Sequence, residues 1–214
     1  LLVVLAMTSM ALHVFFSWVP QNLQSVDGRE EVKATEVVDL KQRLRKAVEE
    51  SYEVEITEAE LNQYIADRLQ LTQSPIVDDF VQIEGVYVDV LPGSLDVTIE
   101  RKFDYPRNIQ DDGSKKVGLL PITQTVSMKL DVTSQQSSDG SVKTTVQFPG
   151  GYFGKAPAPG MLVVLVKPSF DVIAEFFAEE LDLAYHQMSF VTLEDGVIKL
   201  DPRPIRIEEQ LGME

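Results

Sequence analysis

The chain of 214 residues contains no cysteine, two histidines and one tryptophan. Without cysteine it can form neither a disulfide bond nor a thiolate metal site. His186 is the only histidine outside the first 19 residues, so a site built from several histidines of one chain is excluded. The sequence also lacks a GxSxG nucleophile elbow and an HExxH helix. These absences remove the commonest signatures of hydrolases and zinc enzymes.

Basic residues are scarce as well. The chain has 19 Lys and Arg against 34 Asp and Glu, which gives a formal net charge of −15. Nucleic-acid binding requires lysine and arginine to neutralise phosphates, and adhesion to an anionic lipid surface by charge requires the same residues. We therefore expect no nucleic-acid partner.

Charged residues are entirely absent from residues 1–19, LLVVLAMTSMALHVFFSWV. A helix needs about 20 mainly apolar residues to cross the hydrocarbon core of a membrane, and Trp18 suits the interfacial belt. We predict a single transmembrane anchor, with the membrane as partner of residues 1–19. Two alternatives stay open: a secretory signal cleaved after the sequence Ser9-Met10-Ala11, and a helix buried in the domain. The first would leave apolar aromatics at the start of the mature chain, and the second lacks the usual polar edge.

The stretch that follows, residues 20–34 (PQNLQSVDGREEVKA), is polar and unperiodic, and is interpreted as a linker. Arg29 and Lys33 are outnumbered there by three acidic residues, whereas a cytoplasmic flank is typically rich in lysine and arginine. The chain begins on Leu1, so we expect preceding residues that would carry further charge. We predict a single-pass protein of the cell membrane with its domain on the extracytoplasmic side.

Residues 35–210 are predicted to form one α+β domain, a curved antiparallel sheet packed with two or three amphipathic helices. Apolar residues recur at helical spacing over 35–51 and again after Thr57, where Thr57 and Glu60 form a capping box. Between residues 80 and 148 the period is two, which predicts about four long strands with a bulge at Gly85. Ser169 can cap a further helix, and one stripe of that helix holds Phe170, Ile173, Phe177, Leu181 and Ala184. Asp195-Gly196 predicts a C-terminal hairpin.

Three segments together carry a family resemblance: ITEAELNQYI (56–65), GKAPAPGML (154–162) and VTLEDGVIKL (191–200). They resemble the YpmS-type families of small bacterial proteins. The resemblance implies one N-terminal membrane helix and an extracytoplasmic α+β domain. It supplies no catalytic residue, because these families have no well-established activity.

Among side chains that commonly act in catalysis or bind metals, the carboxylates of Asp and Glu are the abundant ones in this chain. Adjacent acids at Asp78-Asp79, Asp111-Asp112 and Glu179-Glu180 lack the spaced loop that wraps calcium. Nothing in the sequence selects two carboxylates for glycoside hydrolysis. We therefore expect no catalytic residue, no metal and no cofactor, and rank a hydrolase last among the functions considered.

Binding is the class of function that the sequence favours. The run Met161–Val166 is unusually apolar, and a groove for a lipid or another apolar ligand would be lined by Met161, Leu162, Leu165, Phe170, Ile173 and Phe177. The alternative is that these side chains simply fill the core. The first hypothesis is a membrane-tethered domain that binds an apolar ligand; the second is an accessory or structural subunit that docks on another cell-envelope membrane protein.

Overall fold

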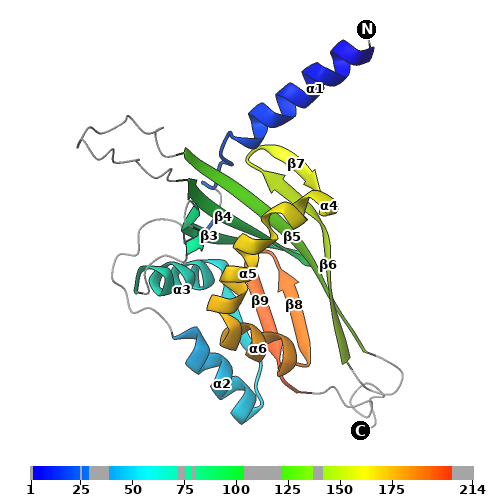
Figure 1. Ribbon diagram of the computed structural model, residues 1–214. Coiled ribbons are helices and arrows are strands. Elements are labelled where there is room, and N and C mark those ends of the chain that lie inside the picture. Colours follow the sequence, from blue (N-terminus) through cyan, green and yellow to red (C-terminus); the bar gives the residue numbers. More distant parts are fainter. Residues whose placement is uncertain are drawn as a thin grey trace, which may run out of the picture.

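A computed structural model describes residues 2–24, 26–28, 39–71, 76–78, 81–103, 122–136 and 142–203 (Figure 1). The helices are α1 (Leu2–Ser17), α2 (Leu40–Glu50), α3 (Glu58–Leu71), α4 (Gly160–Val163), the short 3-10 helix η1 (Val164–Val166), α5 (Lys167–Phe176) and α6 (Ala178–His186). The strands are β1 (Val54–Thr57), β2 (Ile76–Asp78), β3 (Val81–Leu91), β4 (Ser94–Phe103), β5 (Ile122–Gln136), β6 (Val142–Phe153), β7 (Ala156–Pro159), β8 (Phe190–Glu194) and β9 (Val197–Asp201). The predicted α+β class is confirmed.

The larger sheet has six antiparallel strands in the order β2-β3-β4-β5-β6-β7. Side chains alternate between its two faces, as they must in a strand. On one face Val88 pairs with Val97, and Val97 with Met128; on the other Asp89 pairs with Asp96, and Asp96 with Lys129. The meander of four long strands expected from the period of two is β3 to β6. The predicted bulge is also present, since the register shifts between Ile83 and Gly85.

The apolar face of this sheet is covered by helices and by a second sheet of order β1-β9-β8. One hydrophobic core joins buried residues of the large sheet, such as Ile99, to Leu44 of α2, Ile65 of α3, Phe170 of α5 and Ile198 of β9. The hairpin between β8 and β9 turns at Asp195-Gly196, as predicted, with Gly196 at φ 71°. The core therefore lies between the two sheets and the helices packed around them.

Helix α3 begins with the capping box expected from the sequence. The backbone N–H of Glu60 donates to Thr57 Oγ1 at 3.2 Å, and the N–H of Thr57 donates to Glu60 Oε2 at 2.9 Å. Each side chain thus satisfies a backbone amide that the first turn leaves without a helical partner. The apolar stripe of α3 is also confirmed, because Tyr64, Ile65 and Leu69 are buried.

Two further side chains of α3 bind the edge of β3, beyond the short pairing of β2 with β3. Asn62 is 2% exposed; its Oδ1 accepts from the N–H of Val88 at 2.7 Å, and its Nδ2 donates to the Val88 carbonyl at 2.8 Å. Glu58 Oε2 accepts from the N–H of Val90 at 2.8 Å, and the Val90 carbonyl accepts from the N–H of Gly196 at 2.9 Å. These groups replace a missing neighbouring strand and close an edge that would otherwise invite pairing with another chain.

The helices after β7 differ from the expectation at two points. Ser169 does not cap a helix: α5 begins at Lys167, and Ser169 is 1% exposed within it, where its Oγ accepts from Arg101 at 3.3 Å. The helical stripe that was predicted to run on without interruption is divided at Phe177, which separates α5 from α6. The split turns Leu181 outward, with 49% of its surface exposed.

The segment after α1 is not a linker where the structure describes it. Over residues 20–24 and 26–28 the chain lies on the polar face of the large sheet, and Leu23 and Val26 are buried. Gln21, just before them, is bonded to strand side chains: its N–H donates to Thr125 Oγ1 at 2.9 Å and its Nε2 to Ser127 Oγ at 3.1 Å. The expected linker end (29–34) and the domain ends (35–38 and 204–210) lie outside the described residues.

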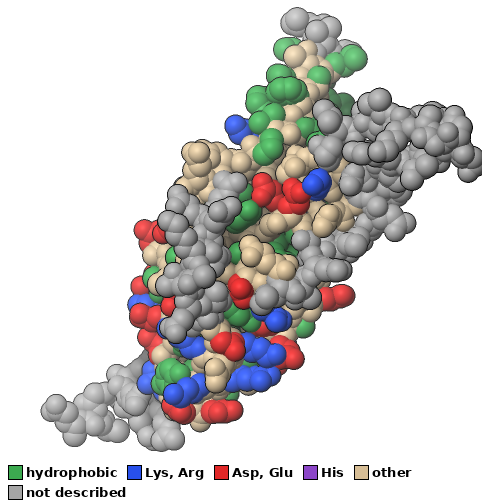
Figure 2. All heavy atoms as spheres, turned by 90° about the vertical axis from the view of Figure 1, so that its left-hand side faces the viewer, with side chains coloured by type: hydrophobic (Ala, Val, Ile, Leu, Met, Phe, Trp, Pro, Cys, Tyr) green, Lys and Arg blue, Asp and Glu red, His purple; other side chains and the backbone are tan. Residues whose placement is uncertain are grey.

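Helix α1 extends away from this body (Figure 1). Hydrophobic side chains lie along the side of α1 seen in Figure 2, whereas charged side chains gather on the body of the molecule. α1 has 16 residues. In the described part of the chain, no helix combines the length and the apolar character that crossing a membrane requires.

Candidate functional site

The C-terminal end of α1 is held by backbone and side-chain hydrogen bonds from the large sheet. The N–H of Lys155 donates to the Phe16 carbonyl at 2.9 Å, and Gln124 Nε2 donates to the Ser17 carbonyl at 3.0 Å. Both acceptors are carbonyls that a helix end leaves without a helical partner. We call this contact, made by Phe16, Ser17, Gln124, Gly154 and Lys155, the α1 joint.

Gly154 has the backbone conformation that the α1 joint requires. Its φ is +52°, in the left-handed region that favours glycine. A Cβ at this position would lie 2.7 Å from the carbonyl oxygens of both Phe16 and Ser17, and it would also meet the Val19 carbonyl. The turn between β6 and β7 can therefore approach the end of α1 only with glycine at this position.

Beyond the joint the chain passes from one face of the sheet to the other. Gln124 binds Ser17, whereas Thr125 Oγ1 accepts from the N–H of Gln21 at 2.9 Å. Consecutive strand residues point to opposite faces. The residues between Ser17 and Gln21 therefore pass from one face of β5 to the other. They do so beside Gly154, where β6 has ended and no longer pairs with β5.

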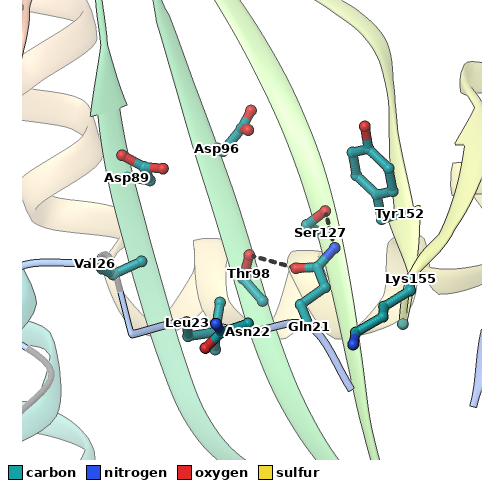
Figure 3. A pocket seen from close by; sticks show the side chains of 11 residues that line it. Gln21, Asn22, Leu23, Val26, Asp89, Asp96, Thr98, Ser127, Tyr152 and Lys155 are labelled. Carbon is teal, nitrogen blue, oxygen red and sulfur yellow. Dashed lines mark hydrogen bonds between the residues drawn. The ribbon is translucent and has the colours of Figure 1, made fainter. Parts of the chain in front are cut away.

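A pocket of about 340 Å³ lies on the polar face beneath this segment (Figure 3). Gln21 bridges two strands above it: its Nε2 donates to Ser127 Oγ at 3.1 Å, and its Oε1 accepts from Thr98 Oγ1 at 3.4 Å. The residues that line the pocket come from the crossing segment and from β3, β4, β5, β6 and the turn after β6: Gln21, Asn22, Leu23, Val26, Asp89, Asp96, Thr98, Ser127, Tyr152, Gly154 and Lys155.

The pKa values of three carboxyl groups in and beside the pocket are raised. Burial raises the pKa of Asp89, and the negative charge of Asp96, its cross-strand neighbour, raises it further. Burial likewise raises the pKa of Asp96, against the lowering effect of Lys129. Burial also raises the pKa of Glu58, although its hydrogen bonds from Val90 and Asp27 act in the opposite direction. The pocket thus combines hydroxyls, an amide and carboxyls, and suits a polar ligand that donates hydrogen bonds.

Metal binding by this pocket finds no support. Across the described ranges, no group of three or more His, Asp or Glu side chains is arranged to hold a metal ion. Of the predicted acidic pairs, only Glu179-Glu180 lies wholly within these ranges. Its members have separate partners, since Glu179 pairs with Lys41 and Arg45 of α2, and Glu180 accepts from Tyr64 Oη at 2.5 Å.

Replacing Asp89 with asparagine is expected to raise the free energy of unfolding at pH 7 by about 0.5 kcal/mol, because it removes a like charge directly opposite Asp96. The pKa of Asp89 is raised on folding, so the contribution of Asp89 to wild-type stability increases as pH falls from neutral towards about 4. The advantage of the variant should therefore shrink over that range, as measured by urea unfolding at several pH values. Glu175→Gln, at an exposed position on α5, is the control. A variant less stable than wild type at pH 7 would contradict the prediction.

The six residues predicted to line an apolar groove do not share one environment. Phe170 and Phe177 belong to the core, Ile173 packs against it, Leu162 is half-buried, and Met161 and Leu165 are 80% and 73% exposed. The 340 Å³ pocket is lined by other residues. Binding of an apolar ligand by these six residues stays a prediction.

The sequence analysis missed the residues of the polar pocket, although one signal was available. A two-residue turn at Pro92-Gly93 sets the register of β3 against β4, and counting outward from it pairs Asp89 with Asp96. The role of Gln21 had no comparable signal, because its partners Thr98 and Ser127 are 77 and 106 residues away in the sequence.

Comparison with known proteins gives no family for this chain. No protein-family model matches it, and no curated protein does. Among solved structures, a crystal structure of lipopolysaccharide binding protein is similar over 74% of this chain and 42% of that one, with 9% sequence identity and a TM-score of 0.21. The match therefore spans less than half of that protein, and so low a score carries no structural argument. The resemblance to YpmS-type families stays a prediction.

Proposed function

We propose that this protein is a non-enzymatic domain held at a cell membrane by α1, which lies in the lipid, with the globular body on the extracytoplasmic side. The observation that carries the proposal is the exposure of α1. Leu5, Met10 and Phe15 are 58%, 71% and 64% exposed. At 3.6 residues per turn these positions point about 140° apart, so they represent all sides of the helix.

An apolar helix exposed on every side needs an apolar environment. A helix that is hydrophobic all round is typical of a protein core or a membrane. Burial of each such side chain in lipid would contribute about 1.5–3 kcal/mol. Trp18, at the end of the apolar run and 43% exposed, has the amphipathic ring that membrane interfaces favour. Lipid is the environment that matches α1 along its whole length.

Two further observations support the extracytoplasmic side and the absence of catalysis in this proposal. The flank after α1 carries few basic residues, which favours the extracytoplasmic side. The hydroxyls of the polar pocket are engaged by Gln21, an arrangement for binding rather than for activating a nucleophile.

Charged residues in α1 test this proposal. The full chain, reconstituted from detergent into phosphatidylcholine vesicles, is expected to float with the lipid in a density gradient. The double variant Met7→Glu/Met10→Glu should lose most of this association, because each charge within an apolar helix costs about 2.5–3.5 kcal/mol in lipid. The matched control is Leu181→Glu/Tyr185→Glu, at two positions of α6 that are 49% and 48% exposed.

Two results would contradict the proposal. The wild-type chain could remain in the lipid-free fractions, or both double variants could lose the association equally. Flotation only after addition of solubilised envelope membrane proteins would favour the alternative, an accessory subunit whose α1 packs against another protein.

A further inference from the structure

A second group of exposed apolar side chains lies close to the C-terminal end of α1. It consists of Phe148 on β6, Met161 on α4, and Val164 and Leu165 on η1, with exposed fractions of 57%, 80%, 64% and 73%. We call these four residues the α4–η1 patch. Four large apolar residues exposed together on a water-soluble surface indicate a surface that binds something.

The patch is built on ordered structure rather than on a loose loop. Helix α4 lies close to β6, since a Cβ on Gly160 would be 3.1 Å from the Phe148 carbonyl oxygen. Val166, at the end of η1, is 4% exposed and joins the core. The apolar run Met161–Val166 is thus divided between two environments. Val166 is anchored in the core, and this holds Val164 and Leu165 at the surface.

The α1 joint connects the patch to α1. Lys155, whose N–H binds the Phe16 carbonyl, directly precedes β7, and α4 begins directly after β7 at Gly160. β7 lies beside the C-terminal end of α1 in Figure 1, and α4 follows at the far end of β7. Between them, Pro157 and Pro159 of β7 are also exposed. The exposed apolar surface of α1 therefore continues through β7 to the patch.

The charge around the patch differs from that of the rest of the chain. Residues 140–170 contain no aspartate or glutamate, but they contain Lys143, Lys155 and Lys167, whereas the whole chain has a net charge of −15. Lys167 pairs with Asp171 at 2.6 Å, and Lys155 is exposed. Lipid headgroups of cell membranes are often anionic, and they attract lysine and repel carboxylates. An apolar surface carried by a carboxylate-free stretch of chain, with Lys155 exposed in it, matches the boundary between headgroups and acyl chains.

We infer that the α4–η1 patch is a second lipid contact, inserted at the headgroup–acyl boundary of the membrane that holds α1. This inference rests on the proposed function, since α1 sets which surface faces the lipid. It gives the body two points of attachment, so the domain lies against the bilayer.

The absence of cysteine makes a direct test possible. Single variants Leu165→Cys, Leu181→Cys and Met10→Cys are labelled with an NBD fluorophore in the full chain. Each is reconstituted into vesicles of phosphatidylcholine and phosphatidylglycerol that carry a nitroxide near the top of one acyl chain. We expect NBD at position 165 to emit at shorter wavelength and to be quenched, while NBD at position 181 keeps its emission. Met161→Cys, also on the patch, repeats the measurement should the label at 165 disturb folding.

The three positions separate the two proposals. Quenching at position 10 without quenching at 165 or 161 overturns the patch as a lipid contact and leaves the membrane anchor in place. Equal quenching at 165 and 181 also overturns it, because the body would then contact lipid without preference. If NBD at position 10 shows neither a shorter emission wavelength nor quenching by the nitroxide, the proposed function itself is overturned.

Discussion

Replacing Asn62 with leucine is expected to lower the free energy of unfolding by about 3 kcal/mol or more. The side chain is buried and makes three hydrogen bonds, to the N–H and the carbonyl of Val88 and to the carbonyl of Asp27 at 2.9 Å. Leucine has the same branching and the same number of side-chain heavy atoms but binds none of these groups. Each buried backbone group left without a partner costs about 1–3 kcal/mol. Urea unfolding followed by circular dichroism measures the loss.

Gln63→Leu provides the control for this variant, because Gln63 is the next residue of α3 and is exposed. A surface change of this kind should alter stability by no more than about 0.5 kcal/mol. Hydrogen exchange adds a local readout: the Val88 amide should exchange faster in the Asn62 variant than in the control. Equal stability of both variants would show that the amide is not needed to close the edge of β3.

The second large effect is expected for Phe177→Asp, which should abolish cooperative unfolding. Phe177 is 7% exposed, and its ring centroid lies 4.9 Å from that of Phe176 and 6.3 Å from that of Tyr64. The substitution removes this packing and buries a carboxylate without a designed partner. The combined cost should exceed about 4 kcal/mol, a large share of the stability of an ordinary domain.

Leu181→Asp is the matched control, since it introduces the same charge four residues later at a position that is 49% exposed. We expect this variant to melt cooperatively within a few degrees of wild type. Thermal melts followed by circular dichroism compare the two. A near-normal melt of Phe177→Asp would place Phe177 outside the core and contradict the packing of α5 and α6.

Local features of the fold were predictable because their causes are local. The capping box needs only Thr57 and Glu60, three residues apart, and its reciprocal bonds formed as expected. The turn at Asp195-Gly196 needs a glycine with positive φ, which the sequence places between two apolar runs. The bulge at Gly85 follows from a break in the period of two.

Features that depend on distant partners were not predictable. Asn62 reads in sequence as an ordinary polar position on a helix, and only the edge of β3 gives it a role. Residues 20–28 read as a linker because their partners, among them Thr125, are far along the chain. Composition alone also placed Met161 and Leu165 beside Phe170, although Met161 and Leu165 are exposed and only Phe170 is buried.

The α1 joint fixes the distance between the end of α1 and the globular body as a property of the fold. In most tethered domains the number of linker residues sets how far the domain can reach. Here only three residues separate Ser17 from Gln21, and both ends are bonded to adjacent residues of β5. Residues added there would not extend a flexible tether. They would separate residues 18–21 from the strand β5 that they bind. If α1 lies in lipid as proposed, the body is held at one distance from the bilayer rather than free to move through a volume beside it.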